Sequence, residues 1–374
     1  MTGVGAWLAL SEARLPFRVT VALLKRLRTP EAVFEALQAG QLGDVPDDAR
    51  QRLFKACNLD LEARLAQLER LGARVVPITS REYPPLLRQA KGAPPVLYVR
   101  GRLPEWNGPV VAIVGSRRAS PYGRVVAESL ARDLAAAGVV VVSGGALGAD
   151  TAAHRGALEV GTTIVVMGTG IDKTYPEQNY DLFESIAERG ALVTELPLGE
   201  PPRGQYFPAR NRIISGMSHG VVVVEAPEKS GALHTAEHAA AQGREVFAVP
   251  GTVNSALSRG CHLLIQQGAK LVSCVEDILE ELPPLPTRKP QPAPVTAEMK
   301  PARAPVPPKP AAPAVAPGSN EEKLLHILTL QQKYIDQVVD EAELPPATVS
   351  AQLLMLELKG LVRRLPGNLY VRVR

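Results

Sequence analysis

Cysteine is scarce in this sequence, and neither sign of charge is in large excess. Cys57, Cys261 and Cys274 are the three cysteines among 374 residues, and no two of them form a CxxC pair. A small, odd number of cysteines argues against a disulfide framework and is typical of a reduced, intracellular protein. The 42 Lys and Arg exceed the 38 Asp and Glu by only four. That net charge is too small to predict a nucleic-acid partner, because such footprints are local patches.

Long hydrophobic runs are also missing. No uninterrupted apolar segment approaches the roughly 20 residues of a membrane-spanning helix. The N-terminus lacks the basic segment, apolar core and small-residue cleavage site of a secretory signal. We therefore expect a cytoplasmic protein that does not contact a membrane. Its length suits about two or three domains.

A regular alternation of strand and helix patterns fills residues 109–282. Apolar strands are predicted at 110–114, 139–143, 162–167, 191–194, 220–225, 245–249 and 270–272. Helices are predicted at Gly123–Ala137, Asp150–Val160, Tyr180–Arg189, Ala209–Met217, Ala232–Gln242, Arg259–Gln267 and Val275–Leu282. Strands that are apolar throughout are buried on both faces, so the pattern predicts an α/β fold with a doubly wound, Rossmann-like parallel sheet. Short strands at 75–78 and 95–99 would be extra edge strands.

Three further regions flank this core. Residues 1–72 have helix-like leucine spacing and predict a helical N-terminal domain, either a supporting bundle or a helix-hairpin-helix-like nucleic-acid module. Residues 283–318 hold thirteen of the 34 prolines and predict an extended basic linker between residues 73–282 and the C-terminal region. Residues 319–374 predict three helices and a hairpin, a winged helix-turn-helix. Its wing is basic, but a protein-contact or structural role is as compatible with the sequence as DNA binding.

The first strand and the second both run into turns that suit an anion. In a parallel sheet such turns meet at the edge formed by the carboxyl ends of the strands, where these folds bind ligands. Ser116, Arg117 and Arg118 follow the first strand, and Arg117 can hold a phosphate with two hydrogen bonds. Gly144 and Gly145 follow the second and permit close backbone approach. Surface arginine and turn-forming glycine are the plain alternatives.

Three later segments add charge to the same edge. Lys173 lies beside Tyr175, which combines a phosphate-binding charge with a ring for base stacking. Arg210-Asn211-Arg212 is predicted to open a helix, where two arginines oppose the helix dipole unless an anion lies between them. Ser230 begins another helix and offers a further anion-binding corner. Phosphate groups are therefore the predicted ligand of this edge.

Metal and cofactor sites are not predicted. His234, Glu237 and His238 fit the HxxEH string of a zinc-binding helix, but five residues are a weak signal and no distant third ligand is evident. His154 is interpreted as a packing or orienting residue. The turn after the first strand is not GxGxxG, so a dinucleotide cofactor is disfavoured.

Taken together, these segments resemble the DprA/Smf family of DNA-processing proteins. The resemblance rests on six ordered motifs: IVGSR (113–117), SGGALGADTAAHRGAL (143–158), GTGIDKTYPEQN (168–179), FPARNRIISGMS (207–218), SGALHTAEHAAAQGREVFAVPG (230–251) and GCHLLIQQGA (260–269). It covers residues 75–272 strongly, and the two ends of the chain more loosely. The N-terminal region departs from the family's glycine-containing hairpin.

The resemblance implies a protein that binds single-stranded DNA without catalysis, forms a homodimer, and loads the RecA recombinase onto incoming strands in natural transformation. The positions expected to contact DNA are Ser116, Arg117, Arg118, Gly144, Gly145, Lys173, Arg210, Asn211, Arg212 and Ser230. Leu263, Leu264 and Ile265 are the candidate surface for the dimer or for RecA, with core packing as the alternative. An aromatic content of only 4% favours sequence-tolerant contact with the strand backbone.

Two other functions are compatible with the sequence. One is a nucleoside-monophosphate phosphoribohydrolase of the lysine-decarboxylase-like type, whose PGGxGTxxE string is only faintly echoed by Ser230–Glu237. The other is a regulator that binds double-stranded DNA through the winged helix. Assaying release of free base, and comparing single- with double-stranded oligonucleotides, would distinguish them.

Overall fold

The computed structural model describes residues 3–284, 319–329, 333–365 and 369–373. It contains two compact units, Met1–Leu285 and Pro286–Arg374. The predicted linker lies outside the described residues except for Pro283 and Pro284.

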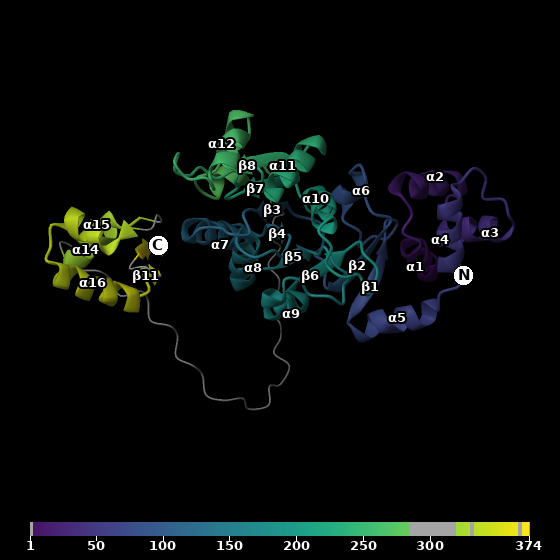
Figure 1. Cartoon of the computed structure of the whole chain (residues 1–374), viewed down its shortest axis with the longest axis horizontal. Coiled ribbons are helices and arrows are strands. Elements are labelled where there is room, and N and C mark those ends of the chain that lie inside the picture. The colour runs from purple at the N-terminus through teal and green to yellow at the C-terminus, as the bar shows by residue number, and fades with distance from the viewer. Residues whose placement is uncertain (1–2, 285–318, 330–332, 366–368, 374) are drawn as a thin grey trace, which may run out of the picture. The chain divides into compact units, whose positions relative to one another are not determined.

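The first unit is built on a nine-stranded sheet (Figure 1). The strands are β1 (Ala73–Pro77), β2 (Val96–Gly101), β3 (Val110–Val114), β4 (Val140–Ser143), β5 (Thr163–Val166), β6 (Ala191–Thr194), β7 (Gly220–Val223), β8 (Glu245–Ala248) and β9 (Lys270–Leu271). Their order is β1-β2-β6-β5-β4-β3-β7-β8-β9. The seven strands from β6 to β9 in this order are parallel, whereas β2 pairs antiparallel with β6 and β1 antiparallel with β2. The parallel sheet and the two extra edge strands are thus confirmed.

Helices cover both faces of this sheet. One face is covered by α6 (Pro85–Gln89), α10 (Tyr206–Met217), α11 (Gly231–Ala241) and α12 (Arg259–Gln266), and the other by α7 (Pro121–Ala136), α8 (Ala149–Val160) and α13 (Glu276–Leu279). Val110, Ala112 and Val114 of β3 pack with the first set, and Val111 and Ile113 with the second. This alternation along an apolar strand is what a sheet buried on both faces requires. The doubly wound fold is therefore confirmed.

The N-terminal helices share a core with the sheet. They are α1 (Val4–Glu12), α2 (Phe17–Leu27), α3 (Pro30–Gln38), α4 (Asp47–Cys57) and α5 (Leu61–Arg70). Leu8 and Leu68 pack in one cluster with Tyr98 of β2 and with Phe183 of α9 (Tyr180–Arg189). The Tyr98 hydroxyl also donates to Ser11 Oγ at 3.0 Å. The predicted boundary at residue 72 consequently falls inside one compact unit.

Most predicted helices begin and end within two residues of their observed bounds. α10 is the exception that affects the site, because it begins at Tyr206, three residues before the predicted start. Arg210 and Arg212 are therefore the fifth and seventh residues of this helix. The prediction that they lie in its first turn is wrong, and with it the argument from the helix dipole, whose effect is confined to the terminal turn.

The second unit is a winged helix. It comprises α14 (Asn320–Ile327), β10 (Lys333–Tyr334), α15 (Ile335–Ala342), α16 (Pro346–Leu358), β11 (Val362–Leu365) and β12 (Leu369–Arg372). Its strands pair antiparallel in the order β10-β12-β11. Ser319 caps α14, accepting from Glu322 N at 3.3 Å. The three helices and the hairpin were predicted; the short β10 was not. No helix in the described parts of either unit is long and apolar enough to cross a membrane.

A shared core predicts that the N-terminal helices unfold together with the sheet. Leu8 is fully buried against the sheet-side cluster, so Leu8→Ala should lower the free energy of unfolding of the first unit by about 2–5 kcal/mol. Val4→Ala is the control, because Val4 lies on the same helix and is exposed. The measurement is urea denaturation followed by circular dichroism. If the curve has two transitions and Leu8→Ala shifts only the one at lower urea concentration, residues 1–72 fold independently.

Candidate nucleic-acid interface

A cavity of about 570 Å³ opens between the carboxyl ends of β3 and β7. The chain leaves β3 toward β4, β5 and β6 on one side, and returns to β7, β8 and β9 on the other. This reversal is the topological switch point at which open α/β sheets bind ligands. The cavity is lined by Val114, Gly115, Ser116, Arg117, Ala146, Asp150, Tyr175, Pro202, Gly204, Phe207, Pro208, Arg210, Asn211, Ile214, Pro227, Lys229, Ser230, Gly231, Ala232 and Thr235.

Arg117 is an exposed cation of this cavity. Its Cζ lies 5.2 Å from the centre of the Phe207 ring. The Phe207 ring lies 5.4 Å from that of Tyr175, with the two planes tilted by 41°. An arginine held on an aromatic face keeps its N–H groups available for a phosphate, and the exposed Tyr175 ring offers a surface for a base. Of the pair Lys173 and Tyr175, the tyrosine lines the cavity and the lysine does not. That they flank a nucleotide stays a prediction.

Arg210 also lines the cavity, but its guanidinium serves the fold. The residue is 6% exposed, and Nη1 donates to Gly144 O at 2.6 Å and to Val166 O. Burial lowers the pKa of Arg210 to about 10, and the charge of Asp150 opposes this shift. Burial in turn raises the pKa of Asp150, which the charge of Arg210 counteracts. The side chain expected to hold phosphate is thus engaged with the ends of β4 and β5.

Gly144 and Gly145 have structural roles that the sequence did not reveal. A Cβ on Gly144 would lie 2.6 Å from the Arg210 guanidinium, so glycine is needed there to admit Arg210. Gly145 has φ of 71°, and a Cβ would lie 2.5 Å from the Phe183 ring. Its carbonyl accepts from Asn179 Nδ2 at 2.9 Å. Neither glycine lines the cavity, so contact of their backbone with an anion stays a prediction.

Arg212 lies away from the cavity. Its Nη2 donates to Glu195 Oε2 at 2.5 Å, and both side chains are 23% exposed. Its side chain also approaches Gly92, where a Cβ would be 3.6 Å from Arg212 Cδ. Arg212 is therefore paired with Glu195 and not a free cation. Residues two positions apart on a helix do not share one face, so Arg212 does not point in the same direction as Arg210.

Lys173 and Arg118 are both exposed and both lie outside the lining. Lys173 Nζ is 3.5 Å from Asp172 Oδ2. The backbone N–H of Arg118 donates to Ser116 Oγ at 3.1 Å, so Ser116, which is buried in the wall of the cavity, shapes the turn that presents Arg117. Both cations remain predictions for the rim of the site.

The helix N-termini differ in what they offer an anion. At α7, the Glu225 carboxylate already accepts from Ser120 N at 2.8 Å and from Ser120 Oγ at 2.6 Å. At α11, Ser230 caps the helix by accepting from Ala232 N at 3.3 Å, and the exposed Lys229 precedes it. Asn211 Nδ2 donates to Gly231 O at 3.1 Å and joins α10 to this corner. The start of α11 thus faces the cavity through Ser230, Gly231 and Ala232, and anion binding there stays a prediction.

His154 and His234 each have a polar partner within the first unit. His154 is buried with Nδ1 at 2.8 Å from Thr163 Oγ1, and burial together with Arg210 lowers its pKa to about 3. It is a neutral packing residue, as interpreted from the sequence. His234 Nδ1 lies 3.0 Å from Glu237 Oε2 on the exposed face of α11. Within the described ranges, no three His, Cys, Asp or Glu side chains are grouped closely enough to hold a metal ion.

Two lining residues with functional side chains, Phe207 and Lys229, were not named as site residues from the sequence. Phe207 stands three residues before Arg210, so both project from one face of α10. The helix predicted from the sequence began at Ala209, so Phe207 was not expected to belong to it. Lys229 precedes the Ser230 cap, and a lysine at that place is indistinguishable from a solvated surface residue until the fold brings β3 and β7 together.

Family models match both units of the chain. Residues 74–283 match DNA recombination-mediator protein A, and residues 307–368 match the DprA winged helix domain. The chain is 39% identical to protein Smf of Escherichia coli over 330 residues, which is 87% of this chain and 84% of that protein. It is 40% identical to the DNA processing protein DprA of Streptococcus pneumoniae over 265 residues, 69% of this chain and 92% of that one.

Solved structures give the same result. The crystal structure of DprA from S. pneumoniae matches with a TM-score of 0.68 at 36% identity, covering 76% of this chain and 99% of that one. DNA processing protein A from Helicobacter pylori, described for its single-stranded DNA binding mode, matches with a TM-score of 0.51 at 31% identity, covering 56% of this chain and 94% of that one. Since the family model covers more than half of the sequence and the relatives most of it, the chain belongs to the DprA/Smf family of DNA-processing proteins.

Proposed function

We propose that this protein binds single-stranded DNA in the cavity at the switch point. The observation that carries the proposal is the group formed by Arg117, Phe207 and Tyr175, in which a free guanidinium and two rings face one cavity. Lys229 and the start of α11 add a second place for phosphate. A single strand exposes both its phosphates and the faces of its bases, and this combination recognises both without reading sequence.

The strand follows the open edge of the sheet in this proposal. Arg117 binds a phosphate, Tyr175 stacks on a base, and the corner at Ser230 binds a neighbouring phosphate. Arg118 and Lys173 add charge at the rim. Arg210, Asn211, Gly144 and Gly145 hold the walls of the cavity in place, and Arg212 supports α10 through Glu195. The action is binding without catalysis.

The two alternatives are less well supported. The phosphoribohydrolase reading needs a glycine-rich PGGxGTxxE turn, whereas the chain has Lys229-Ser230-Gly231 at the start of α11. A regulator of double-stranded DNA would use α16 as its reading helix, and α16 contains no Lys or Arg to approach phosphates. Free-base release from a nucleoside monophosphate would support the enzyme, and preference for a duplex would support the regulator.

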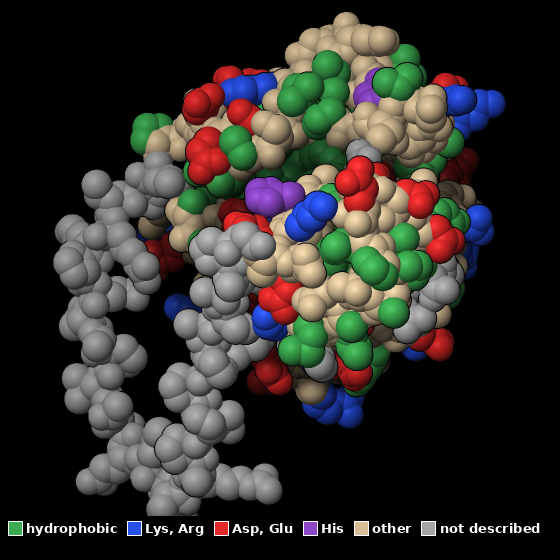
Figure 2. Space-filling view, turned by 90° about the vertical axis from the view of Figure 1, so that its left-hand side faces the viewer, with side chains coloured by type: hydrophobic (Ala, Val, Ile, Leu, Met, Phe, Trp, Pro, Cys, Tyr) green, Lys and Arg blue, Asp and Glu red, His purple; other side chains and the backbone are tan. Residues whose placement is uncertain are grey.

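We further propose that the protein acts in the cytoplasm as a homodimer that loads RecA in natural transformation or recombination. The supporting observation is α12, whose Leu263 is 42% exposed. Leu264 and Ile265 instead pack against the core. Figure 2 shows that hydrophobic side chains are exposed among polar ones on the face that it draws.

Arg117→Ala is expected to weaken binding of a labelled single-stranded oligonucleotide and to reduce its salt dependence. Loss of one phosphate contact lowers the slope of log K against log salt by about 0.7. The measurement is fluorescence anisotropy at several NaCl concentrations. Arg155→Ala, which removes an exposed arginine of α8 outside the cavity, is the control. An Arg117→Ala protein with the affinity and slope of the control would remove the site.

Tyr175→Leu is expected to weaken the same binding without changing the salt slope, because a stacking contact releases no counterions. Loss of one stacked base costs about 1–3 kcal/mol. Tyr180→Leu is the control, since Tyr180 is an exposed tyrosine on α9 beyond the cavity lining. Equal affinities for the two variants would show that the strand is held by its phosphates alone.

Leu263→Asp is expected to convert the homodimer to a monomer, because a carboxylate at the centre of an apolar contact is left unpaired. Sedimentation equilibrium measures the mass. Val160→Asp changes an exposed apolar residue of α8, on the opposite face of the sheet, and should leave the mass unchanged. A wild-type protein that is monomeric at micromolar concentration would exclude the assembly, and unchanged stimulation of RecA filament formation by Leu263→Asp would exclude α12 as the RecA surface.

A further inference from the structure

The outer wall of the cavity is the segment of residues 199–206, which connects the strand β6 to α10. Pro202, Gly204, Phe207 and Pro208 line the cavity from this side, and residues 201–205 are all exposed. The segment leads directly into α10, whose first residue is Tyr206 and whose N-cap, Gln205, makes no side-chain capping hydrogen bond. Phe207, on which Arg117 lies, is the second residue of α10, so its position depends both on the Arg210 anchor of that helix and on what holds the segment 199–206.

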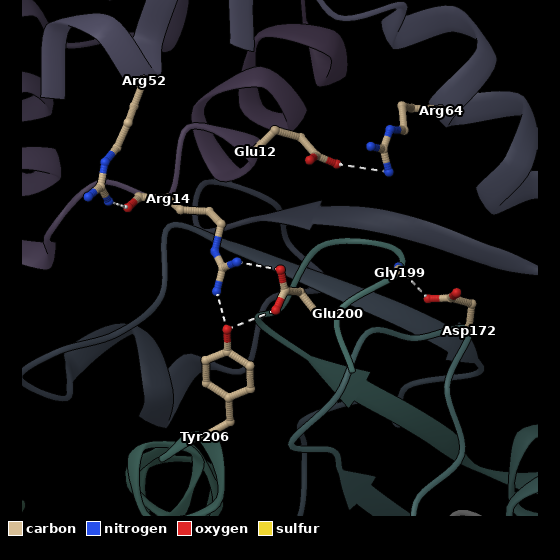
Figure 3. A network of polar contacts seen from close by, with 8 residues as sticks. All are labelled: Glu12, Arg14, Arg52, Arg64, Asp172, Gly199, Glu200 and Tyr206. Atoms are coloured by element: carbon tan, nitrogen blue, oxygen red, sulfur yellow. Dashed lines mark hydrogen bonds and ion pairs between the residues drawn. The ribbon is translucent and has the colours of Figure 1, made fainter. Parts of the chain in front are cut away.

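Side chains of the N-terminal region hold it (Figure 3). Arg14 Nη2 donates to the Tyr206 hydroxyl at 2.6 Å, and Arg14 Nη1 donates to Glu200 Oε1. The Tyr206 hydroxyl donates in turn to Glu200 Oε2 at 2.8 Å. The Arg14 guanidinium also lies 5.6 Å from the Tyr206 ring centre. One arginine thus closes a triangle with a carboxylate and a phenol, both of which belong to the wall segment.

The wall segment is also hydrogen-bonded to the loop that follows β5. Gly199 N donates to Asp172 Oδ1 at 2.8 Å, and Gly170 N donates to Glu200 O at 2.9 Å. Asp172 belongs to the loop that carries Tyr175. These bonds hold the beginning of the segment, whereas Arg14 holds its end at Tyr206.

Arg14 is itself held firmly. It has a φ of 48°, a left-handed conformation that is uncommon for a residue with a Cβ and persists when the surroundings determine it. Its carbonyl accepts from Arg52 Nη1 of α4 at 3.1 Å. The backbone of Arg14 is therefore fixed by the helical region, while its side chain reaches the wall of the cavity.

We propose that Arg14 is a positioning residue for the cavity, and that through it the N-terminal helical region sets the place of Tyr206 and Phe207 without contacting the strand. The consequence for single-strand affinity rests on the function proposed above. The mechanical part does not, because it concerns the protein alone. The two parts are measured separately.

The mechanical part is tested by limited proteolysis with trypsin. The Arg203–Gly204 bond lies within the exposed wall segment, and Arg14→Ala should speed cleavage there at least about fivefold, since opening of weakly held segments governs such cleavage. Arg18→Ala is the matched control, because it removes an exposed arginine of the same region. Mass spectrometry of the early fragments identifies the bond. Cleavage of Arg14→Ala at the rate of Arg18→Ala would overturn the proposal.

The functional part is tested by oligonucleotide anisotropy with salt titration. Arg14→Ala should raise Kd about fivefold or more, within the range of coupling between residues of one network, and should keep the wild-type salt slope. Arg14→Lys can still pair with Glu200, so its Kd should lie between those of the wild type and Arg14→Ala. The Kd of the double variant Arg14→Ala, Glu200→Gln should be no higher than that of Arg14→Ala, because both residues act in one network.

The remaining outcomes also decide the question. A salt slope reduced by about 0.7 in Arg14→Ala would mean that Arg14 binds phosphate directly, which overturns a positioning role. Wild-type affinity in Arg14→Ala, in a protein whose binding Arg117→Ala does weaken, overturns the functional part. If Arg117→Ala has no effect either, the proposed site fails, and the proteolysis result alone decides whether Arg14 holds the wall. Should Arg14→Ala melt at a markedly lower temperature, Glu200→Gln replaces it in both measurements.

Discussion

The buried guanidinium of Arg210 is the interaction on which the site depends. It brings the carbonyl groups at the ends of β4 and β5 into hydrogen bonds with α10. Without it, those carbonyls would lose a buried donor, which is costly. Gly144 has no side chain because the guanidinium occupies the space. Once α10 is held there, Phe207 lies one turn earlier on the same face and reaches the cavity.

Three arginines that the sequence does not distinguish therefore have different roles in the structure. Arg117 is exposed over a ring and free to meet a ligand, Arg210 is buried and completes the fold, and Arg212 is paired with Glu195. The difference lies in desolvation and in the neighbours that each position finds. A buried cation is tolerated where several carbonyls accept from it and a carboxylate is near, and Asp150 supplies that charge for Arg210.

The N-terminal helices are part of the same architecture. They share a core with β1, β2 and α9, and Arg14 extends from them to the wall of the cavity. A cavity at the switch point needs walls on both sides, and here the sheet supplies one while the loop before α10 supplies the other. Such loops make few contacts of their own and are easily opened, so an external support has a direct effect on their order.

The sequence by itself determined the fold class and the edge that carries the site. Strands that are apolar throughout are buried on both faces, so the doubly wound sheet followed from the local pattern. The turns after β3 and before α11 followed as well, since Ser116, Arg117 and Ser230 all line the cavity. The tertiary structure alone decided which charges are free. Whether Arg117, Arg210 or Arg212 meets solvent, a carbonyl or a carboxylate depends on residues about 20 to 90 positions away in the chain, and on a helix start that local propensity misplaced by three residues. Phe207, Glu195 and Arg14 contact residues that are distant in the sequence, and hydrophobic periodicity does not predict such contacts.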